Sequence, residues 1–92
     1  GLSTPAALWA RLHLYPVPAS STVTLEATGL PDQSNVPVEV LSALGQVVYQ
    51  ATTTVRQGRL HTTLPLSPLA AGVYLVRVGL REGQLVQRLV RE

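Results

Sequence analysis

The chain contains no cysteine, methionine, phenylalanine or lysine, and it contains a single tryptophan. Without cysteine there is no disulfide framework and no thiolate metal site. Acidic side chains are also few, so few carboxylates are available to form a catalytic or metal site. Hydrophobic residues make up 46% of the chain and charged residues 13%, which is the reverse of the balance found in disordered chains. We therefore expect a folded domain.

The size and charge of the chain exclude several kinds of protein. A chain of 92 residues makes one domain with one modest core and no deep catalytic cleft. The net charge of +2 comes from scattered arginines without a basic run, so no nucleic-acid partner is expected. The longest apolar run, residues 69–76, is too short to cross a bilayer, so no membrane insertion is expected.

The beginning of the chain shows neither an initiator Met nor a signal peptide. We therefore expect a piece of a longer protein, with residues 1–10 as a linker or a remnant of cloning and residues 11–92 as the domain. Trp9 in this linker is expected to pack onto the domain, with stacking on a sugar as the alternative.

Hydrophobic and polar residues alternate with a period of two along most of the chain. In residues 22–28, for example, Val23, Leu25 and Ala27 share one face. The last strand is apolar on both faces, and a single helical turn is allowed at residues 67–71. The pattern predicts seven strands, at residues 11–15, 22–28, 36–42, 47–55, 59–66, 73–80 and 84–91.

Three short connections end on a glycine, namely Gly45, Gly58 and Gly83. A three-residue hairpin loop needs a left-handed residue at its last position, and glycine adopts that conformation without a Cβ clash. We therefore predict three hairpins and a positive φ at each glycine. The longer connection at residues 29–35 is expected to carry the chain from one sheet to another. Seven short strands with one apolar face each predict an all-β, antiparallel two-sheet β-sandwich.

The residues needed for catalysis are sparse and scattered. A Ser–His–Asp arrangement would have to use Asp32 with His13 or His61, and no nucleophile elbow accompanies them. Both histidines fall on outward positions of the alternation. A catalytic pair of carboxylates would require Glu26, Glu39, Glu82 or Asp32 to converge, and three of these four are residues of strand faces or turns. The sequence thus predicts no enzyme activity, no metal and no cofactor.

The segment Tyr15-Pro16-Val17-Pro18 allows two interpretations. It can be a polyproline ligand for a partner domain. Alternatively, the two prolines end a first strand and protect a sheet edge, which is the interpretation we favour.

Four segments, taken in order, resemble the type A C-terminal sorting domain of the type IX (Por) secretion system over residues 12–92. They are Leu14-Tyr15-Pro16-Val17-Pro18-Ala19-Ser20, residues 40–48 with Leu44-Gly45-Gln46, residues 69–78 with Ala71-Gly72-Val73-Tyr74, and Gln87-Arg88-Leu89-Val90-Arg91. The positions that match the family, and so become candidates for partner recognition, are Pro16, Pro18, Gly45, Gly72, Tyr74, Arg88 and Arg91. The chain departs from the family at Val17, where Asn is usual, at Ser21, where an acidic residue is common, and in having Arg for the terminal Lys.

The resemblance implies an immunoglobulin-like β-sandwich at the C-terminus of an exported protein of Bacteroidetes-type bacteria. Such a domain directs an N-terminally fused cargo through the periplasm and an outer-membrane translocon, to the cell surface or the medium. A shuttle protein binds it, and a sortase-like peptidase usually removes it while attaching the cargo to surface lipopolysaccharide. The expected form is a monomer.

Two further expectations concern function. The last strand with its two arginines is expected to be needed for export, and deletion of residues 88–92 is expected to leave a folded domain in the periplasm. Arg88 and Arg91 should point to opposite faces of that strand, and they have a second explanation as residues that keep an edge strand soluble. The alternative functions are an immunoglobulin-like adhesive or carbohydrate-binding module, or a structural spacer.

Overall fold

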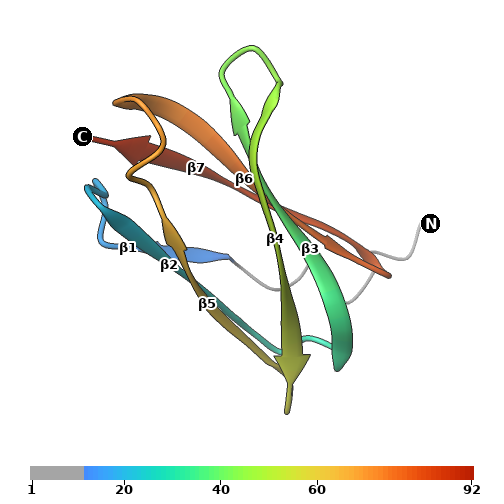
Figure 1. The fold of residues 1–92 in the computed structure, drawn as a ribbon. Helices are drawn as coiled ribbons and strands as arrows, with labels where there is room; N and C mark the ends of the chain where they lie inside the picture. The colour runs from blue at the N-terminus through green and yellow to red at the C-terminus, as the bar shows by residue number, and fades with distance from the viewer. Residues whose placement is uncertain (1–11) are drawn as a thin grey trace, which may run out of the picture.

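The computed structural model describes residues 12–92, which form strands joined by turns (Figure 1). No helix in this part of the chain is long and apolar enough to span a membrane. The expectations for residues 1–10, including Trp9, and for Arg11 lie outside the described residues. The strands are β1 (His13–Tyr15), β2 (Thr22–Thr28), β3 (Gln33–Ser42), β4 (Val47–Arg56), β5 (Arg59–Pro65), β6 (Gly72–Leu80) and β7 (Gly83–Arg91).

The strands fold into two facing layers that remain joined by one ladder (Figure 1). The hydrogen-bonded order is β1-β2-β5-β4-β3-β6-β7, and all neighbours are antiparallel. β4 and β5 pair only at Val55–Leu60 and Arg56–Arg59, and beyond this point they diverge. One layer therefore holds β1, β2 and β5, and the other holds β4, β3, β6 and β7. This arrangement confirms the predicted antiparallel sandwich.

The core between the layers consists of aliphatic side chains that alternate along the strands. Val23, Leu25, Val36, Val38 and Val40 are all fully buried, as the alternation predicts. Tyr74 is buried as well, whereas Tyr49 and Ala51 of β4 pack only against the margin of the core. The period-two alternation puts Val47 on the same face of β4 as Tyr49, Ala51 and Val55, and for Val47 this prediction is wrong. Val47 is 42% exposed, because it follows a register shift next to the β3–β4 hairpin.

Two of the three glycine turns contain a left-handed glycine. Gly45 has φ 85° and closes the predicted three-residue loop, with its N–H donating to the carbonyl of Ser42 at 2.9 Å. Gly58 has φ 75°, but Gln57 is left-handed too, at 54°. Because Arg56 pairs with Arg59, this loop has two residues and corresponds to a type I′ turn rather than a three-residue loop.

Gly83 differs from the other two glycines. Its φ of 150° is positive, as predicted, but it is the first residue of β7 and pairs with Leu80. The loop is therefore only Arg81 and Glu82. The allowed helical turn at residues 67–71 is also absent, and a turn closed by the Leu69 N–H and the Leu66 carbonyl takes its place.

The connection from β2 to β3 crosses from one layer to the other, as predicted. The N–H of Leu30 donates to the carbonyl of Gly58 at 3.1 Å. The N–H of Gly58 in turn donates to Oδ1 of Asp32 at 2.8 Å. Asp32 thus fixes the crossing segment to the β4–β5 turn, which gives this carboxylate a structural role.

Candidate recognition surface

The first and last motifs of the sequence meet at one end of the sandwich. Ala19, in the loop after β1, donates its N–H to the carbonyl of Val90 at 2.9 Å and accepts from the N–H of Glu92 at 2.8 Å. These bonds form a parallel bridge between Ala19 and Arg91, and Ala19 is fully buried. In Figure 1 the blue loop between β1 and β2 lies at the left, below the red C-terminal end of β7.

The prolines lie in the exposed part of the same loop. β1 ends at Tyr15, and both Pro16 and Pro18 are exposed, as is Val17 with 64% of its surface accessible. The peptide bonds that precede the two prolines are cis. The structure thus agrees with the interpretation that the prolines end the first strand, and it places them directly beside the end of β7.

Arg91 is committed to contacts within the fold. Its Nε donates to the carbonyl of Leu66 at 3.0 Å, and its Nη1 donates to the carbonyl of Glu92. Leu66 itself donates its N–H to the carbonyl of Ser21 at 2.8 Å. Arg91 therefore ties the end of β7 to the connection between β5 and β6.

Gly72 and Tyr74 lie at the beginning of β6, beside the end of β7. Gly72 pairs with Arg91 and Tyr74 pairs with Leu89. The Tyr74 hydroxyl donates to the carbonyl of Ala70 at 2.5 Å, which holds the segment that leads into β6. Both residues thus help to shape this end of the sandwich.

The structure does not bring Gly45 and Arg88 into the same cluster. Gly45 lies in the β3–β4 hairpin, which projects at the top of Figure 1. Arg88 is exposed on the outer face of β7, opposite Leu75 of β6. Arg88 and Arg91 therefore point to opposite faces of the strand, as predicted.

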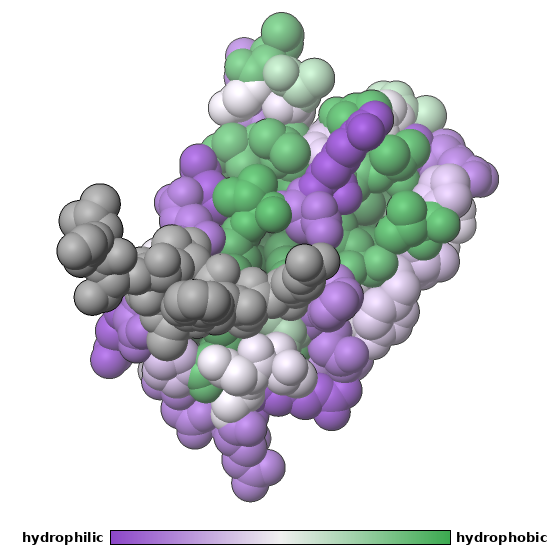
Figure 2. Space-filling model, turned by 180° about the vertical axis from the view of Figure 1, so that it is seen from behind, coloured by the Kyte–Doolittle hydropathy of each residue, from purple (hydrophilic) through white to green (hydrophobic). Residues whose placement is uncertain are grey.

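The outer face around Arg88 carries hydrophobic side chains that the candidate set did not include. Val73, Leu75 and Val86 are each between 42% and 52% exposed. Figure 2 shows hydrophobic surface between the β3–β4 hairpin and the end of β7, with a hydrophilic side chain crossing it. The sequence signal was available, because the last strand is apolar on both faces, but alternation alone does not tell which of those faces stays exposed.

Two ion pairs lie on the outer faces of the two layers. Arg77 donates to Glu39 through Nε at 2.9 Å and also through Nη2, and this hydrogen bonding lowers the pKa of Glu39 below its ordinary value. Arg59 donates to Glu26 through Nη2 at 2.5 Å, and this hydrogen bond lowers the pKa of that carboxyl. The two glutamates face opposite sides of the sandwich and do not form a catalytic pair.

The histidines lie on the outer face of the smaller layer. His13 and His61 are both exposed, as predicted, and each is opposite Glu26 on a neighbouring strand. This cross-strand row was not foreseen, because it depends on the pairing of three strands. The carboxylate between the two histidines is held by Arg59. Within residues 12–92, no group of three or more His, Asp or Glu side chains is close enough to hold a metal ion.

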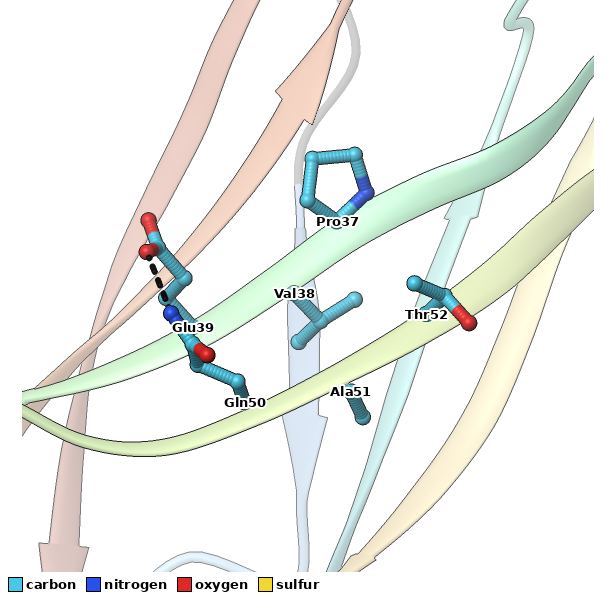
Figure 3. A pocket seen from close by; sticks show the side chains of 6 residues that line it. All are labelled: Pro37, Val38, Glu39, Gln50, Ala51 and Thr52. Carbon is cyan, nitrogen blue, oxygen red and sulfur yellow. Dashed lines mark hydrogen bonds between the residues drawn. The ribbon is translucent and has the colours of Figure 1, made fainter.

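A shallow groove of about 400 Å³ lies along β3 and β4 (Figure 3). Its charged group, Glu39, is already bound by Arg77 and accepts a hydrogen bond from Gln50 at 3.4 Å. No predicted site residue lines it. The groove is lined by Pro37, Val38, Glu39, Gln50, Ala51 and Thr52.

A comparison with known protein families gives a match over most of the chain. A family model described as the secretion system C-terminal sorting domain matches residues 13–92, nearly the whole described part of the chain. No curated protein matches the chain. The matched segment includes the loop around Ala19 and the whole of β7, the two segments that the structure joins.

Proposed function

The chain belongs to the family of secretion system C-terminal sorting domains, and we propose that it acts by being bound at the end of the sandwich where its motifs meet. A domain of this family is the sorting signal of a type IX secretion cargo, so the protein that carries it is exported. The resemblance noted in the sequence is thereby confirmed. The residues of the recognition surface are the part that we propose.

The pairing of Ala19 with Val90 and Glu92 is the observation that carries this proposal. It holds the exposed loop of Pro16, Val17 and Pro18 against the end of β7. A partner therefore binds one preformed surface rather than two separate peptides. Because the two segments are already held in place, less conformational entropy is lost on binding. Gly72, Tyr74 and Arg91 support this surface from beneath, and Gly45 shapes the neighbouring hairpin.

We propose for the partners the route that the resemblance implies. The fused cargo crosses the periplasm, a shuttle protein and the outer-membrane translocon bind the domain, and a sortase-like peptidase acts on it at the cell surface. The domain serves as a monomeric signal and catalyses no step itself. Export of the cargo and interaction with the type IX machinery follow from the family. The individual partners and their order are our proposal.

The alternative of carbohydrate binding gains no support from the aromatic residues. Tyr74 is buried, Tyr49 is half-buried, and Tyr15 is the exposed aromatic residue within the described part of the chain. Sugar-binding faces use several exposed aromatic rings together. We therefore retain sorting as the function.

The deletion of residues 88–92 is a poor test of this function. It would remove Leu89, which is 1% exposed, together with the bonds from Ala19 to Val90 and Glu92. We now expect that deletion to destabilise the domain rather than to leave it folded. Point variants on the exposed loop separate recognition from folding.

The test uses residues 1–92 fused to a reporter that carries a periplasmic signal, in a bacterium with the type IX machinery. The intact domain should place the reporter outside the cell. Val17→Asp adds a charge to the exposed loop and should lower export about tenfold, the effect of losing roughly 1.4 kcal/mol of binding. Ser34→Asp, an exposed position in β3 away from the loop, should export normally.

Two results would count against the proposal. Normal export of Val17→Asp would show that the loop is not part of the recognition surface. Retention of the reporter with the intact domain would remove support for sorting by this chain altogether.

A further inference from the structure

The outer face of β6 and β7 is hydrophobic along adjacent rows of the sheet. Val73 pairs with Val90, Leu75 with Arg88, and Arg77 with Val86. The outward side chains Val73, Leu75, Val86 and Val90 therefore form a continuous surface, which we call the apolar strip. Three of them are more than 40% exposed, and Figure 2 shows hydrophobic surface over this region.

The fold does not require a hydrophobic outer face. The same sandwich has a polar outer face on its other layer, where β2 and β5 carry threonines, charges and a histidine. Thr24 and Thr63 there share a hydrogen bond at 3.0 Å between their hydroxyls. Both are outer faces of similar strands, so the sandwich architecture by itself does not account for the apolar strip. Contiguous exposed apolar patches mark binding surfaces.

Arg88 lies within the strip with its charge uncommitted. Among residues 12–92 it takes part in no ion pair, whereas Arg77 and Arg59 are paired with Glu39 and Glu26. Residues 1–11 contain no Asp or Glu side chain that could reach it. Arg91, the other terminal arginine, is bound to the Leu66 carbonyl. Arg88 is therefore the terminal arginine that is available to a partner.

We propose that the apolar strip and Arg88 together dock an extended segment of the secretion machinery that carries a carboxylate between apolar side chains. This inference rests on the proposed sorting function and assigns a second contact surface to it. The charge of Arg88 selects the carboxylate, because a guanidinium next to apolar groups gains most from a bidentate acidic partner. The exposed valines and Leu75 bury the apolar side chains around that pair.

The two terminal arginines thus have different tasks. Arg91 positions the end of β7 from the inner side, and Arg88 presents its charge on the outer side. The strand alternation forces this division, since residues three apart on a strand face opposite ways. A partner that contacts Arg88 binds the outer face of β7, whereas a partner that contacts Val17 binds the end of the sandwich.

The reporter fusion described above tests this docking surface with variants that leave the core intact. Arg88→Gln and Val86→Thr should each lower export about tenfold, in line with the loss of one charge-assisted contact or one apolar contact at an interface. Arg88→Lys keeps the charge but loses the bidentate geometry, so its export should lie between that of the intact domain and that of Arg88→Gln. Arg56→Glu reverses the charge of an exposed arginine at the end of β4, outside the apolar strip, and this variant should export normally.

Thermal unfolding of the purified variants shows whether they are folded. Arg88 and Val86 are both exposed, so all four variants should unfold within a few degrees of the intact domain, as surface substitutions do. If one variant unfolds at a much lower temperature, the export of the remaining folded variants tests the docking surface.

The outcomes separate this inference from the sorting function itself. Normal export of Arg88→Gln and Val86→Thr, with an intact domain that is exported, would overturn the docking surface and leave the sorting function standing. Equal export of Arg88→Gln and Arg88→Lys would overturn the carboxylate partner. Failure of the intact domain would overturn the sorting function.

Discussion

Ala19 lies between Val90 and Glu92, and its N–H and carbonyl are both hydrogen-bonded to the end of β7, at 2.9 and 2.8 Å. Because Ala19 is completely buried, a larger side chain has no room at this position. The bridge brings the loop after the first strand and the end of the last strand into one surface. The proposed function depends on this contact.

The two terminal arginines should differ in their effect on stability. Arg91→Ala loses the hydrogen bond from Nε to the Leu66 carbonyl and should destabilise the domain by about 1 kcal/mol. Arg88→Ala removes an exposed side chain without an ion pair in the described structure and should change stability by less than about 0.5 kcal/mol. Urea unfolding of both variants measures the difference. Equal losses would contradict the division of tasks.

The left-handed conformation of Gly58 predicts a specific pattern of substitution. Gly58→Ala should destabilise the domain by about 1 kcal/mol, because an alanine Cβ is strained at φ 75°. The nearest atom to that Cβ would be the Leu30 carbonyl oxygen at 3.5 Å, so backbone strain and not a clash sets the cost. Gly58→Asn should be milder, since asparagine tolerates this region. Thermal unfolding of the two variants tests the order.

Gly79 is required for a different reason, namely space. A Cβ at this position would lie 3.1 Å from Cγ of Pro37, so Gly79→Ala pushes against the proline ring. We expect a loss of about 1–3 kcal/mol, the usual range for an overpacked site. Pro37→Ala should recover part of this loss in the double variant, and a double-mutant cycle from urea unfolding measures the coupling. Strict additivity would show that the two residues do not interact.

The ion pair between Glu39 and Arg77 predicts how stability depends on pH. The hydrogen bond from Arg77 holds the pKa of Glu39 below its ordinary value of 4.5. A lowered folded-state pKa adds stability above the unfolded value, and this contribution is lost as the pH falls through the folded value. The melting temperature should therefore be flat near neutrality and should decrease below pH 4.5.

The variant Glu39→Gln isolates this contribution. It should show a smaller decrease of the melting temperature in acid than the intact domain, because it cannot be protonated. Glu82→Gln in the β6–β7 turn is the matched control, since Glu82 makes no ion pair in the described part of the chain. An unchanged acid decrease in Glu39→Gln would refute the assignment to this pair.

The strands were the part of the fold most readily predicted from sequence. Residues 22–28 alternate without interruption, and β2 has these same bounds. The pattern is informative because each strand has one face on the core. β4 is the instructive exception. It lies at the edge of its layer, where burial constrains the sequence weakly. Val47 in addition follows the register shift beside the β3–β4 hairpin, and the alternation therefore assigns it to the wrong face.

The turns and the site were harder to predict, for different reasons. A glycine that ends a short connection fits a left-handed loop residue, as at Gly45, and equally fits the first residue of a strand, as at Gly83. The motif positions were known from the resemblance, but their contacts were not. The parallel bridge between Ala19 and Arg91 joins residues from opposite ends of the domain, and no local sequence pattern predicts it.

The direction of β1 determines how a passenger protein is placed relative to the signal. Leu12 lies beside the middle of β7, where its carbonyl accepts from Nε2 of Gln87 at 3.2 Å. From there the chain runs through His13 and Tyr15 toward the loop that contains Ala19. The polypeptide thus enters the domain on its flank and travels toward the paired motifs. For a passenger fused upstream, the point of attachment to the described domain is therefore Leu12, beside the middle of β7, and not the end where the two motifs meet.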